Sequence, residues 1–242
     1  MAKIRFMQTT IPSPRPTLRG ISSMATRQLL AELVAAYAQH SDCVIAIESV
    51  GGVDAAKRVQ AGEPFDVVFL ASDAIDKLMA AGHIDARSKV DLVHSGVAVA
   101  VRAGAQQPDI SSENAVRQAV LAARSISYST GPSGVALGQL FERWGIADTI
   151  RERMVQAPPG VPVGTLVARG EVELGFQQFS ELIHVQGITV LGPLPPEIQI
   201  TTTFSAGICT GSTQAPVARD LLDFMASAQA ADAKRRQGME PA

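Results

Sequence analysis

Short apolar runs alternate with amphipathic stretches along most of this chain. The run FDVVFLA at 65–71 is apolar almost throughout, which is typical of a parallel strand covered on both faces. The stretch 24–39 instead spaces Leu30, Leu33 and Tyr37 three and four residues apart, which predicts an amphipathic helix. Because runs and stretches alternate with short connections, the pattern predicts an α/β fold with doubly wound, mostly parallel sheets.

The same pattern gives approximate bounds for each element. Strands are expected at 17–22, 43–49, 65–71, 96–101, 125–129, 173–177, 188–191 and 201–209. Helices are expected at 24–39, 54–61, 74–81, 112–124, 133–144, 163–169 and 216–233, with a short one from Ser180. We expect Ser22 or Ser23, Asp73 and Ser133 to cap helices. Residues 1–16, with a short strand considered at Lys3–Gln8, are expected to form an N-terminal extension, because three prolines follow that strand.

Composition narrows the class of protein. The chain has 242 residues, of which 46% are hydrophobic and 18% charged, as in a compact globular protein. The formal net charge of -2 gives no general attraction to nucleic acid, so no nucleic-acid partner is expected. The densest basic group, Lys234-Arg235-Arg236, is expected to be a solvated last helical turn, where cations interact favourably with the helix dipole.

Metal, membrane and export signals are absent from the sequence pattern. Neither Cys43 and Cys209 nor the four histidines show the spacing of a metal site, so we expect no metal, no cofactor and two buried thiols. No run reaches the roughly 18 apolar residues of a membrane span. The N-terminus lacks the apolar region of a signal peptide. We therefore expect a cytoplasmic protein for the sequence as given, and a periplasmic one if the chain has been trimmed.

Several short motifs follow one another in a familiar order. A Ser-Ser turn opens the first helix and Gly51-Gly52 the second, followed by QAGEPFDVVFLASD at 60–73, GPSG at 131–134 and GEVELGF at 170–176. From residue 17 to the C-terminus, this ordered set resembles the type II periplasmic solute-binding proteins, most nearly their molybdate-binding branch.

The resemblance implies a two-lobed fold with a ligand between the lobes. Lobe 1 would comprise residues 1–95 and 203–242, and lobe 2 would comprise residues 96–202. Two crossing strands would join the lobes, and ligand binding would close the hinge between them. The expected partner is a small anionic ligand, an oxyanion or a carboxylate, with a transporter as a further partner only if the chain is exported.

Four turns supply residues suited to an anion at the carboxyl ends of strands, where helix N-termini converge. The candidate ligand-binding residues are Ser22, Ser23, Gly51, Gly52, Ser129, Thr130, Ser133, Gly134, Gln177 and Gln178. The resemblance implies that Ser23 hydrogen-bonds the oxyanion. It also implies a serine-rich turn where this chain has Gly51-Gly52, so the hydroxyl donors of molybdate binders are missing there. For each turn, plain helix capping is the alternative interpretation.

Two functions from different classes fit this pattern. The first is a small-anion binding protein that clamps an oxyanion or small carboxylate. The alternative is an isomerase on the same scaffold, since aconitate isomerases, which interconvert cis- and trans-aconitate, resemble the same branch. An isomerase needs a base for the proton shift. His94 is the candidate catalytic residue, with Asp54 and Glu48 as other bases whose presence in the cleft would favour the enzyme.

Overall fold

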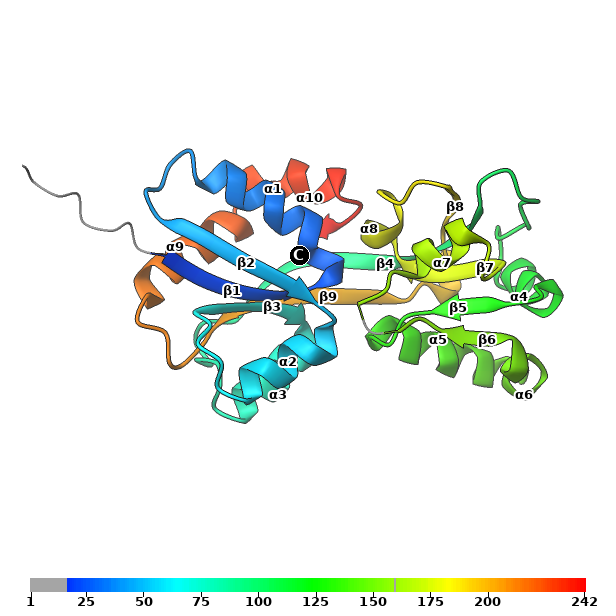
Figure 1. The fold of residues 1–242 in the computed structure, drawn as a ribbon, viewed down its shortest axis with the longest axis horizontal. Helices are drawn as coiled ribbons and strands as arrows, with labels where there is room; N and C mark the ends of the chain where they lie inside the picture. Colours follow the sequence, from blue (N-terminus) through cyan, green and yellow to red (C-terminus); the bar gives the residue numbers. More distant parts are fainter. Residues whose placement is uncertain (1–16, 159) are drawn as a thin grey trace, which may run out of the picture.

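The computed structural model describes residues 17–158 and 160–242, which form two α/β lobes lying side by side (Figure 1). The extension predicted for residues 1–16, including the strand considered at Lys3–Gln8, lies outside the described residues. One continuous run of strands crosses both lobes in the order β2-β1-β3-β9-β4-β7-β5-β6. The predicted two-lobed α/β architecture is therefore confirmed.

The first lobe is built on three parallel strands, β1 (Thr17–Ser23), β2 (Val44–Val50) and β3 (Val67–Ala71). Its helices cover both faces of this sheet, as Figure 1 shows. They are η1 (Met24–Thr26), α1 (Arg27–Tyr37), α2 (Gly52–Gln60), α3 (Ser72–Ala80), α9 (Ala215–Ala226), η4 (Ala228–Ala230) and α10 (Ala231–Arg236). Every residue of β3 is buried, as the apolar run at 65–71 predicted.

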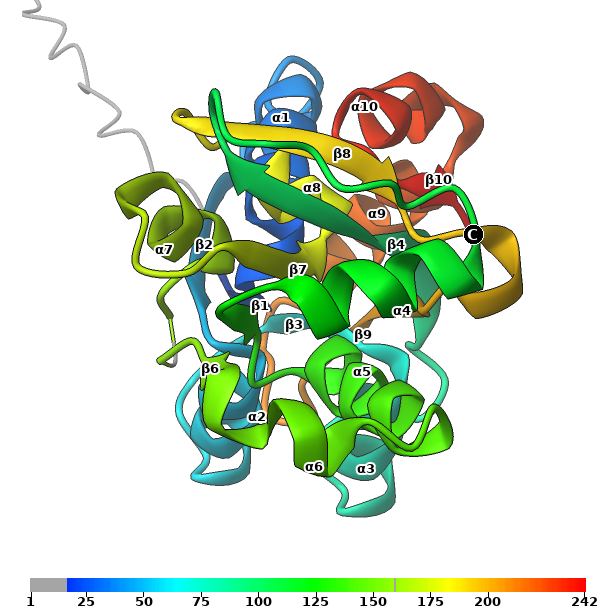
Figure 2. The ribbon, with the colours of Figure 1, turned by 90° about the vertical axis from the view of Figure 1, so that its right-hand side faces the viewer.

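The second lobe has its own parallel strands, β5 (Ile126–Tyr128), β6 (Met154–Gln156) and β7 (Leu174–Gln178). Figure 2 shows α4 and α5 running along the face of this sheet. The other elements are α4 (Glu113–Ala122), α5 (Pro132–Arg143), α6 (Ala147–Ile150), η2 (Arg151–Arg153), α7 (Val163–Arg169), α8 (Phe179–Leu182), β8 (Ile188–Pro193) and η3 (Pro196–Ile198).

Two long antiparallel strands join the lobes, β4 (Val90–Arg102) and β9 (Thr201–Ile208). In lobe 1, β9 pairs with β3, and in lobe 2, β4 pairs with β7 and β8. The strand predicted at 96–101 starts earlier, at Val90, because its first residues pair with β9 inside lobe 1. A short final strand, β10 (Glu240–Pro241), pairs with β4.

Separate apolar cores stabilise the two lobes. In lobe 1, one core lies under α1 and α9 and includes Phe69 and Leu222, and another lies under α2 and α3. In lobe 2, the largest core surrounds Phe141 and Phe176, whose rings meet edge to face with centroids 6.2 Å apart. Burying each such side chain contributes about 1.5–3 kcal/mol. Each lobe therefore has its own apolar core behind the surface that it turns toward the other lobe.

The helix starts correct two of the predicted caps. The helix α3 begins at Ser72, so Asp73 lies inside its first turn, where a carboxylate faces the positive end of the helix dipole. The helix α5 begins with Pro132 after the cap residue Gly131, because the fixed φ of proline suits the first helical position. Ser23 does occupy a cap position, but its hydroxyl makes no capping hydrogen bond.

The closing helix predicted at 216–233 is divided into α9, η4 and α10. The break falls at Ser227, whose backbone is extended and whose hydroxyl donates to the carbonyl oxygen of Phe224 at 2.7 Å. The last helical turn does carry Lys234-Arg235-Arg236. Its expected solvation is wrong for Lys234, which is only 2% exposed, since α10 packs against several elements of lobe 1.

Candidate ligand cleft

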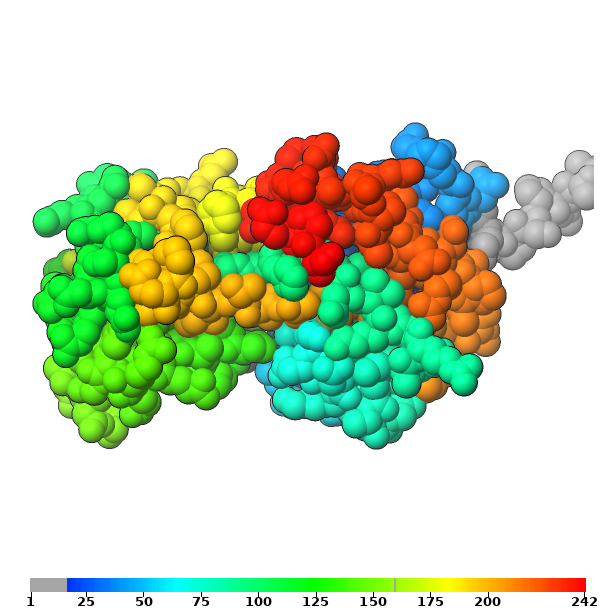
Figure 3. Space-filling model, turned by 180° about the vertical axis from the view of Figure 1, so that it is seen from behind, coloured from blue at the N-terminus to red at the C-terminus, as the bar shows by residue number. Residues whose placement is uncertain are grey.

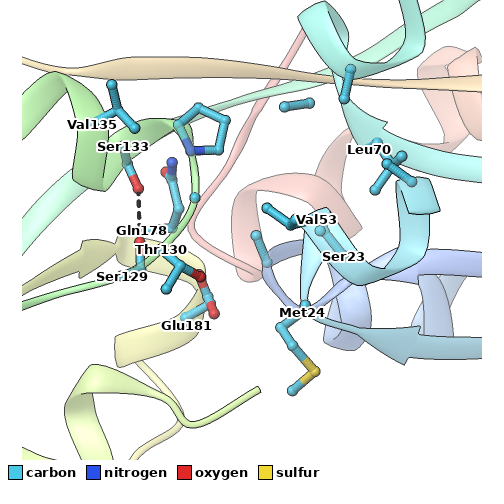
Figure 4. A pocket seen from close by; sticks show the side chains of 18 of the residues that line it. Ser23, Met24, Val53, Leu70, Ser129, Thr130, Ser133, Val135, Gln178 and Glu181 are labelled. Carbon is cyan, nitrogen blue, oxygen red and sulfur yellow. Dashed lines mark hydrogen bonds between the residues drawn. The ribbon is translucent and has the colours of Figure 1, made fainter. Parts of the chain in front are cut away.

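A cleft of about 660 Å³ lies between the lobes, and both contribute to its lining. Figure 4 shows Ser23, Met24 and Val53 on one wall and Ser129, Thr130, Ser133, Gln178 and Glu181 on the other. Apolar residues cover much of the space between these groups, among them Ala56, Leu70, Pro132, Val161 and Phe204. A small molecule with both polar and apolar parts is therefore suited to this cleft.

The lobe 1 wall is formed by the ends of β1 and β2 and the helices that follow them. Ser23 is 7% exposed and its hydroxyl has no hydrogen-bond partner. Gly51 and Gly52 line the wall at the N-terminus of α2, where backbone N–H groups without an intrahelical partner attract anions. Lys57 and Lys77 also line the cleft, and Lys77 is paired with Asp73 at 3.3 Å. On this wall, which Asp73 also lines, negative charge can be stabilised by Ser23, the N-terminus of α2 and the two lysines.

The lobe 2 wall begins with the turn between β5 and α5. Ser129, Thr130 and Ser133 line the cleft there, and the hydroxyls of Ser129 and Ser133 lie 3.3 Å apart. Because each hydroxyl has one proton to donate, the pair offers an anion one donor while its mutual hydrogen bond persists and two when that bond is exchanged for the ligand. The N-terminus of α5 lies directly behind them.

The deeper part of the same wall carries two amides and a carboxyl group. The backbone N–H of Gly164 donates to Oε1 of Gln177 at 3.3 Å, and Nε2 of Gln177 donates to Oε1 of Glu181 at 2.8 Å. The Nε2 of Gln178 donates to the hydroxyl of Thr202 at 2.9 Å, whereas its buried Oε1 has no partner. The strand β7 ends at Gln178 and α8 starts at once, which brings Gln177 and Glu181 together.

Glu181 has an unusual protonation equilibrium for a carboxylic acid. Burial raises its pKa from 4.5 to about 7, although the hydrogen bond from Gln177 acts in the opposite direction. The carboxyl group is only partly accessible and faces the cleft (Figure 4). Near neutral pH it can therefore both accept and donate a proton, as a general acid–base requires.

Three of the candidate residues lie outside the cleft lining. Ser22 points to the other face of β1, where its hydroxyl lies 2.8 Å from that of Ser49, because neighbouring strand residues face opposite sides. Gly134 allows close packing, since a Cβ there would lie 1.9 Å from the carbonyl oxygen of Ser129. His94 is exposed on β4, and its Nδ1 lies 3.0 Å from the hydroxyl of Thr203. His94 therefore does not line this cleft, and its catalytic role stays a prediction.

The two other bases considered from the sequence are also absent from the lining. Glu48 is paired with Arg58 at 2.6 Å, and this guanidinium lowers the pKa of Glu48. Asp54 lies in the first turn of α2 but does not line the cleft. The remaining candidates, Ser23, Gly51, Gly52, Ser129, Thr130, Ser133, Gln177 and Gln178, all line it. Their role in binding stays a prediction.

Glu181 is the residue that the sequence interpretation missed. The only available signal was its place four residues after Gln177, at the passage from an apolar strand into a short helix. Residues four apart meet on one side of a continuous helix, but Gln177 belongs to a strand. The hydrogen bond between them therefore depends on the sharp change from β7 to α8.

Metal binding and membrane insertion find no support in the part of the chain that the structure describes. Among residues 17–158 and 160–242, no group of three or more His, Cys, Asp or Glu residues is placed to hold a metal ion. Within the same ranges, no helix has the length and apolar character required to cross a membrane. Cys43 and Cys209 are both buried, as predicted.

Several known proteins are similar to this chain over most of its length. An aconitate isomerase from Pseudomonas sp is 39% identical over 236 residues, covering 94% of this chain and 89% of that protein. Among solved structures, the periplasmic molybdate-binding protein of Azotobacter vinelandii superposes with a TM-score of 0.76 at 20% identity, covering 92% of this chain and 98% of that one. The sulfate-binding protein SubI from Mycobacterium tuberculosis gives a TM-score of 0.76 at 15% identity, covering 94% and 87%.

The structural neighbours confirm the fold of the type II periplasmic binding proteins, as the sequence resemblance predicted. Residues 18–240 match the family described as bacterial extracellular solute-binding protein. With this match and the 39% identical relative, the chain belongs to the bacterial extracellular solute-binding protein family.

Proposed function

We propose that this protein is an isomerase that binds a small unsaturated polycarboxylate in the cleft and moves one proton between two of its carbon atoms. The observation that carries this proposal is Glu181, a carboxyl group that lines the cleft and, among the described residues, has no cationic partner, whereas Asp73, the other acid in the lining, is paired with Lys77. A protein that only retains an anion gains nothing from a carboxylate beside it, because like charges repel.

The chemistry requires one group that removes a proton and later returns one. In aconitate, the CH₂ group is flanked by a carboxylate and by a carbon–carbon double bond. Removing a CH₂ proton sends the electron pair of the C–H bond into the adjacent π-system, and adding a proton at the far carbon completes the shift of the double bond. A base whose pKa lies near the operating pH serves both steps, and the pKa of about 7 of Glu181 meets this condition.

The anion donors complete the proposed site. Ser23 and the N-terminus of α2 would hold one carboxylate from lobe 1, while Ser129 and Ser133 would hold another from lobe 2. Donors preorganised around developing negative charge lower the barrier to proton removal. The 39% identity to an aconitate isomerase supports aconitate as the substrate to try first.

A second candidate is capture of a small anion without turnover. Family membership and the hydroxyl groups of Ser23, Ser129 and Thr130 favour it. The isomerase moves a proton between carbon atoms of the ligand and the anion-binding protein does not, so an assay of turnover distinguishes the two functions. The transporter partner and the cellular location of the protein stay predictions, and immunoblotting of cell fractions would test the location.

The decisive experiment is ¹H NMR of cis-aconitate in D₂O with the purified protein. We expect trans-aconitate to appear with deuterium at the carbon that receives the proton. Glu181→Gln should lower kcat by roughly 10²- to 10⁴-fold, the usual contribution of a general acid–base, while aconitate still raises Tm. Glu171→Gln, which changes an exposed acid paired with Arg169, is the matched control. Ligand-induced stabilisation without turnover by the wild type would reject the isomerase and leave anion capture.

A further inference from the structure

One side of the cleft holds the two lobes in direct contact. The hydroxyl of Ser180, in α8 of lobe 2, donates to the carbonyl oxygen of Ala25, in η1 of lobe 1, at 3.0 Å. Ser180 is only 5% exposed, so water does not compete for this bond. The two residues are 155 positions apart in sequence, and the bond therefore ties one lobe to the other.

Neighbouring contacts attach the same segment to the C-terminal end of lobe 1. A Cβ at Gly238, whose φ is +71°, would lie 2.8 Å from the ring of Phe179, so the ring packs directly on this backbone. Nε2 of His184 lies 2.6 Å from Oε1 of Gln237. Figure 3 shows the red C-terminal segment against the yellow part of lobe 2. The segment around α8 is thus fastened to lobe 1 at more than one point.

The opposite side of the cleft is open. Val53 on α2 and Val135 on α5 line facing walls and are 50% and 60% exposed. Figure 4 shows them on opposite sides of the space, and Figure 3 shows the molecule hollowed between the cyan and green lobes. Because burying apolar surface is favourable, approach of these walls on closure is favoured. If the cleft closes on a ligand, we expect the α5 side to move most and the α8 side least.

We propose that Ser180 is a positioning residue, whose hydrogen bond to Ala25 fixes Glu181 against the lobe 1 turn Ser23–Ala25 in both the open and the closed cleft. This inference rests on the proposed function. Glu181 follows Ser180 directly, and Ser23, Met24 and Ala25 line the cleft beside it. A substrate carboxylate bound at this turn is then correctly placed for proton transfer before the α5 wall arrives. Positioning of this kind matters because a displacement of about 1 Å can cost roughly 10²-fold in rate.

The test compares Ser180→Ala, Ser180→Cys and Ser180→Thr with the wild type. The alanine variant loses the donor, the cysteine variant keeps a weak one, and the threonine variant keeps the hydroxyl. We expect kcat for cis-aconitate to fall at least tenfold in the alanine variant, less in the cysteine variant, and to recover in the threonine variant, with KM within threefold of the wild type. Should the alanine variant not fold, the cysteine and threonine pair carries the same comparison.

The matched control is Ser227→Ala, because its hydroxyl also donates to a backbone carbonyl but lies away from the cleft. We expect a lower Tm with unchanged kcat. A kcat equal to the wild type in Ser180→Ala, or a parallel loss in Ser227→Ala, would overturn the assignment.

A second readout does not depend on turnover. The infrared carboxylate band of Glu181, identified by its loss in Glu181→Gln, gives the pKa directly. We expect the pKa to move from about 7 toward 4.5 in Ser180→Ala, because the released segment admits water to the carboxyl group. An unchanged pKa would overturn the positioning role. If the wild type does not isomerise aconitate, the proposed function fails while this titration still decides the role of Ser180.

Discussion

The side-chain amide of Gln177 donates to Oε1 of Glu181 at 2.8 Å, and its own oxygen accepts the backbone N–H of Gly164 at 3.3 Å. The Gly164 contact fixes the orientation of the amide, since only the side-chain oxygen can accept a hydrogen bond. Nε2 must then face Glu181. A donor at this position favours the ionised carboxylate and opposes the larger effect of burial. The hydrogen bond from Gln177 therefore keeps the pKa of Glu181 near neutral pH.

Removing this donor should make Glu181 a weaker acid. In Gln177→Met, which keeps similar volume, the pKa of Glu181 is expected to rise above about 7. The basic form of Glu181 then dominates only at higher pH, so the increase of kcat/KM should occur at a higher pH than in the wild type. Rates measured between pH 5 and 9 check this. Gln186→Met, an exposed residue outside the cleft, is the control, and a shift toward lower pH would contradict the assignment.

Ionised Glu181 should also destabilise the folded protein. Its pKa is about 7 when folded and 4.5 as the ordinary value, so the folded state binds more protons between these values and stability falls as pH rises through this range. At about 1.36 kcal/mol per pKa unit, the cost above pH 7 is on the order of 3 kcal/mol.

We therefore expect Glu181→Gln to be more stable than the wild type at pH 8 and about equally stable at pH 4.5. Urea unfolding at the two pH values measures both differences. If Glu181→Gln were no more stable than the wild type at pH 8, the carboxyl group of Glu181 would not be buried and desolvated as described.

The consecutive residues Ser22 and Ser23 should respond in opposite ways to alanine. Ser22 is bonded to Ser49 away from the cleft, so Ser22→Ala should lower the free energy of unfolding by about 1 kcal/mol and leave ligand affinity unchanged. The hydroxyl of Ser23 is buried without a partner. Ser23→Ala should preserve stability and weaken binding of a carboxylate roughly 10- to 100-fold, as expected for a hydrogen bond to a charged group.

Calorimetric titration with cis-aconitate and urea unfolding measure the two quantities for each variant. Equal affinities for wild type and Ser23→Ala would remove Ser23 from the proposed site. A loss of affinity in Ser22→Ala would show that the two faces of β1 are not independent.

Two glycines of α5 provide a matched pair for packing. A Cβ at Gly134 would lie 1.9 Å from the carbonyl oxygen of Ser129, whereas one at Gly138 meets nothing within 4 Å. Gly134→Ala should therefore cost about 1–3 kcal/mol through overpacking and displace the Ser129–Ser133 turn, which weakens ligand binding. Gly138→Ala should stabilise the protein by about 0.4–1 kcal/mol. Thermal unfolding of both variants checks the signs, and similar Tm changes would contradict the close approach.

The sequence by itself determined the order and type of most elements, but not the short strands β6 and β10 or the division of the closing helix. The buried strand β3 and the amphipathic helix α1 follow from local apolar spacing, which backbone geometry alone converts into strand or helix. The boundaries of β4 could not be read in this way, because its first residues are strand only through pairing with β9, more than a hundred residues later. The division of the lobes at residues 95/96 and 202/203 stays a prediction.

The anion-donor turns were also within reach of sequence reasoning, since a strand followed by small or hydroxyl residues and a helix places N–H groups at the sheet edge. Only the tertiary structure shows that Ser22 and Ser23 face different sides of β1, that His94 does not line the cleft and that Glu181 does. The pKa of a carboxyl group depends on which other parts of the chain exclude water from it. The acid–base property of Glu181 therefore depends on its burial in the folded chain and could not be predicted from its place in the sequence.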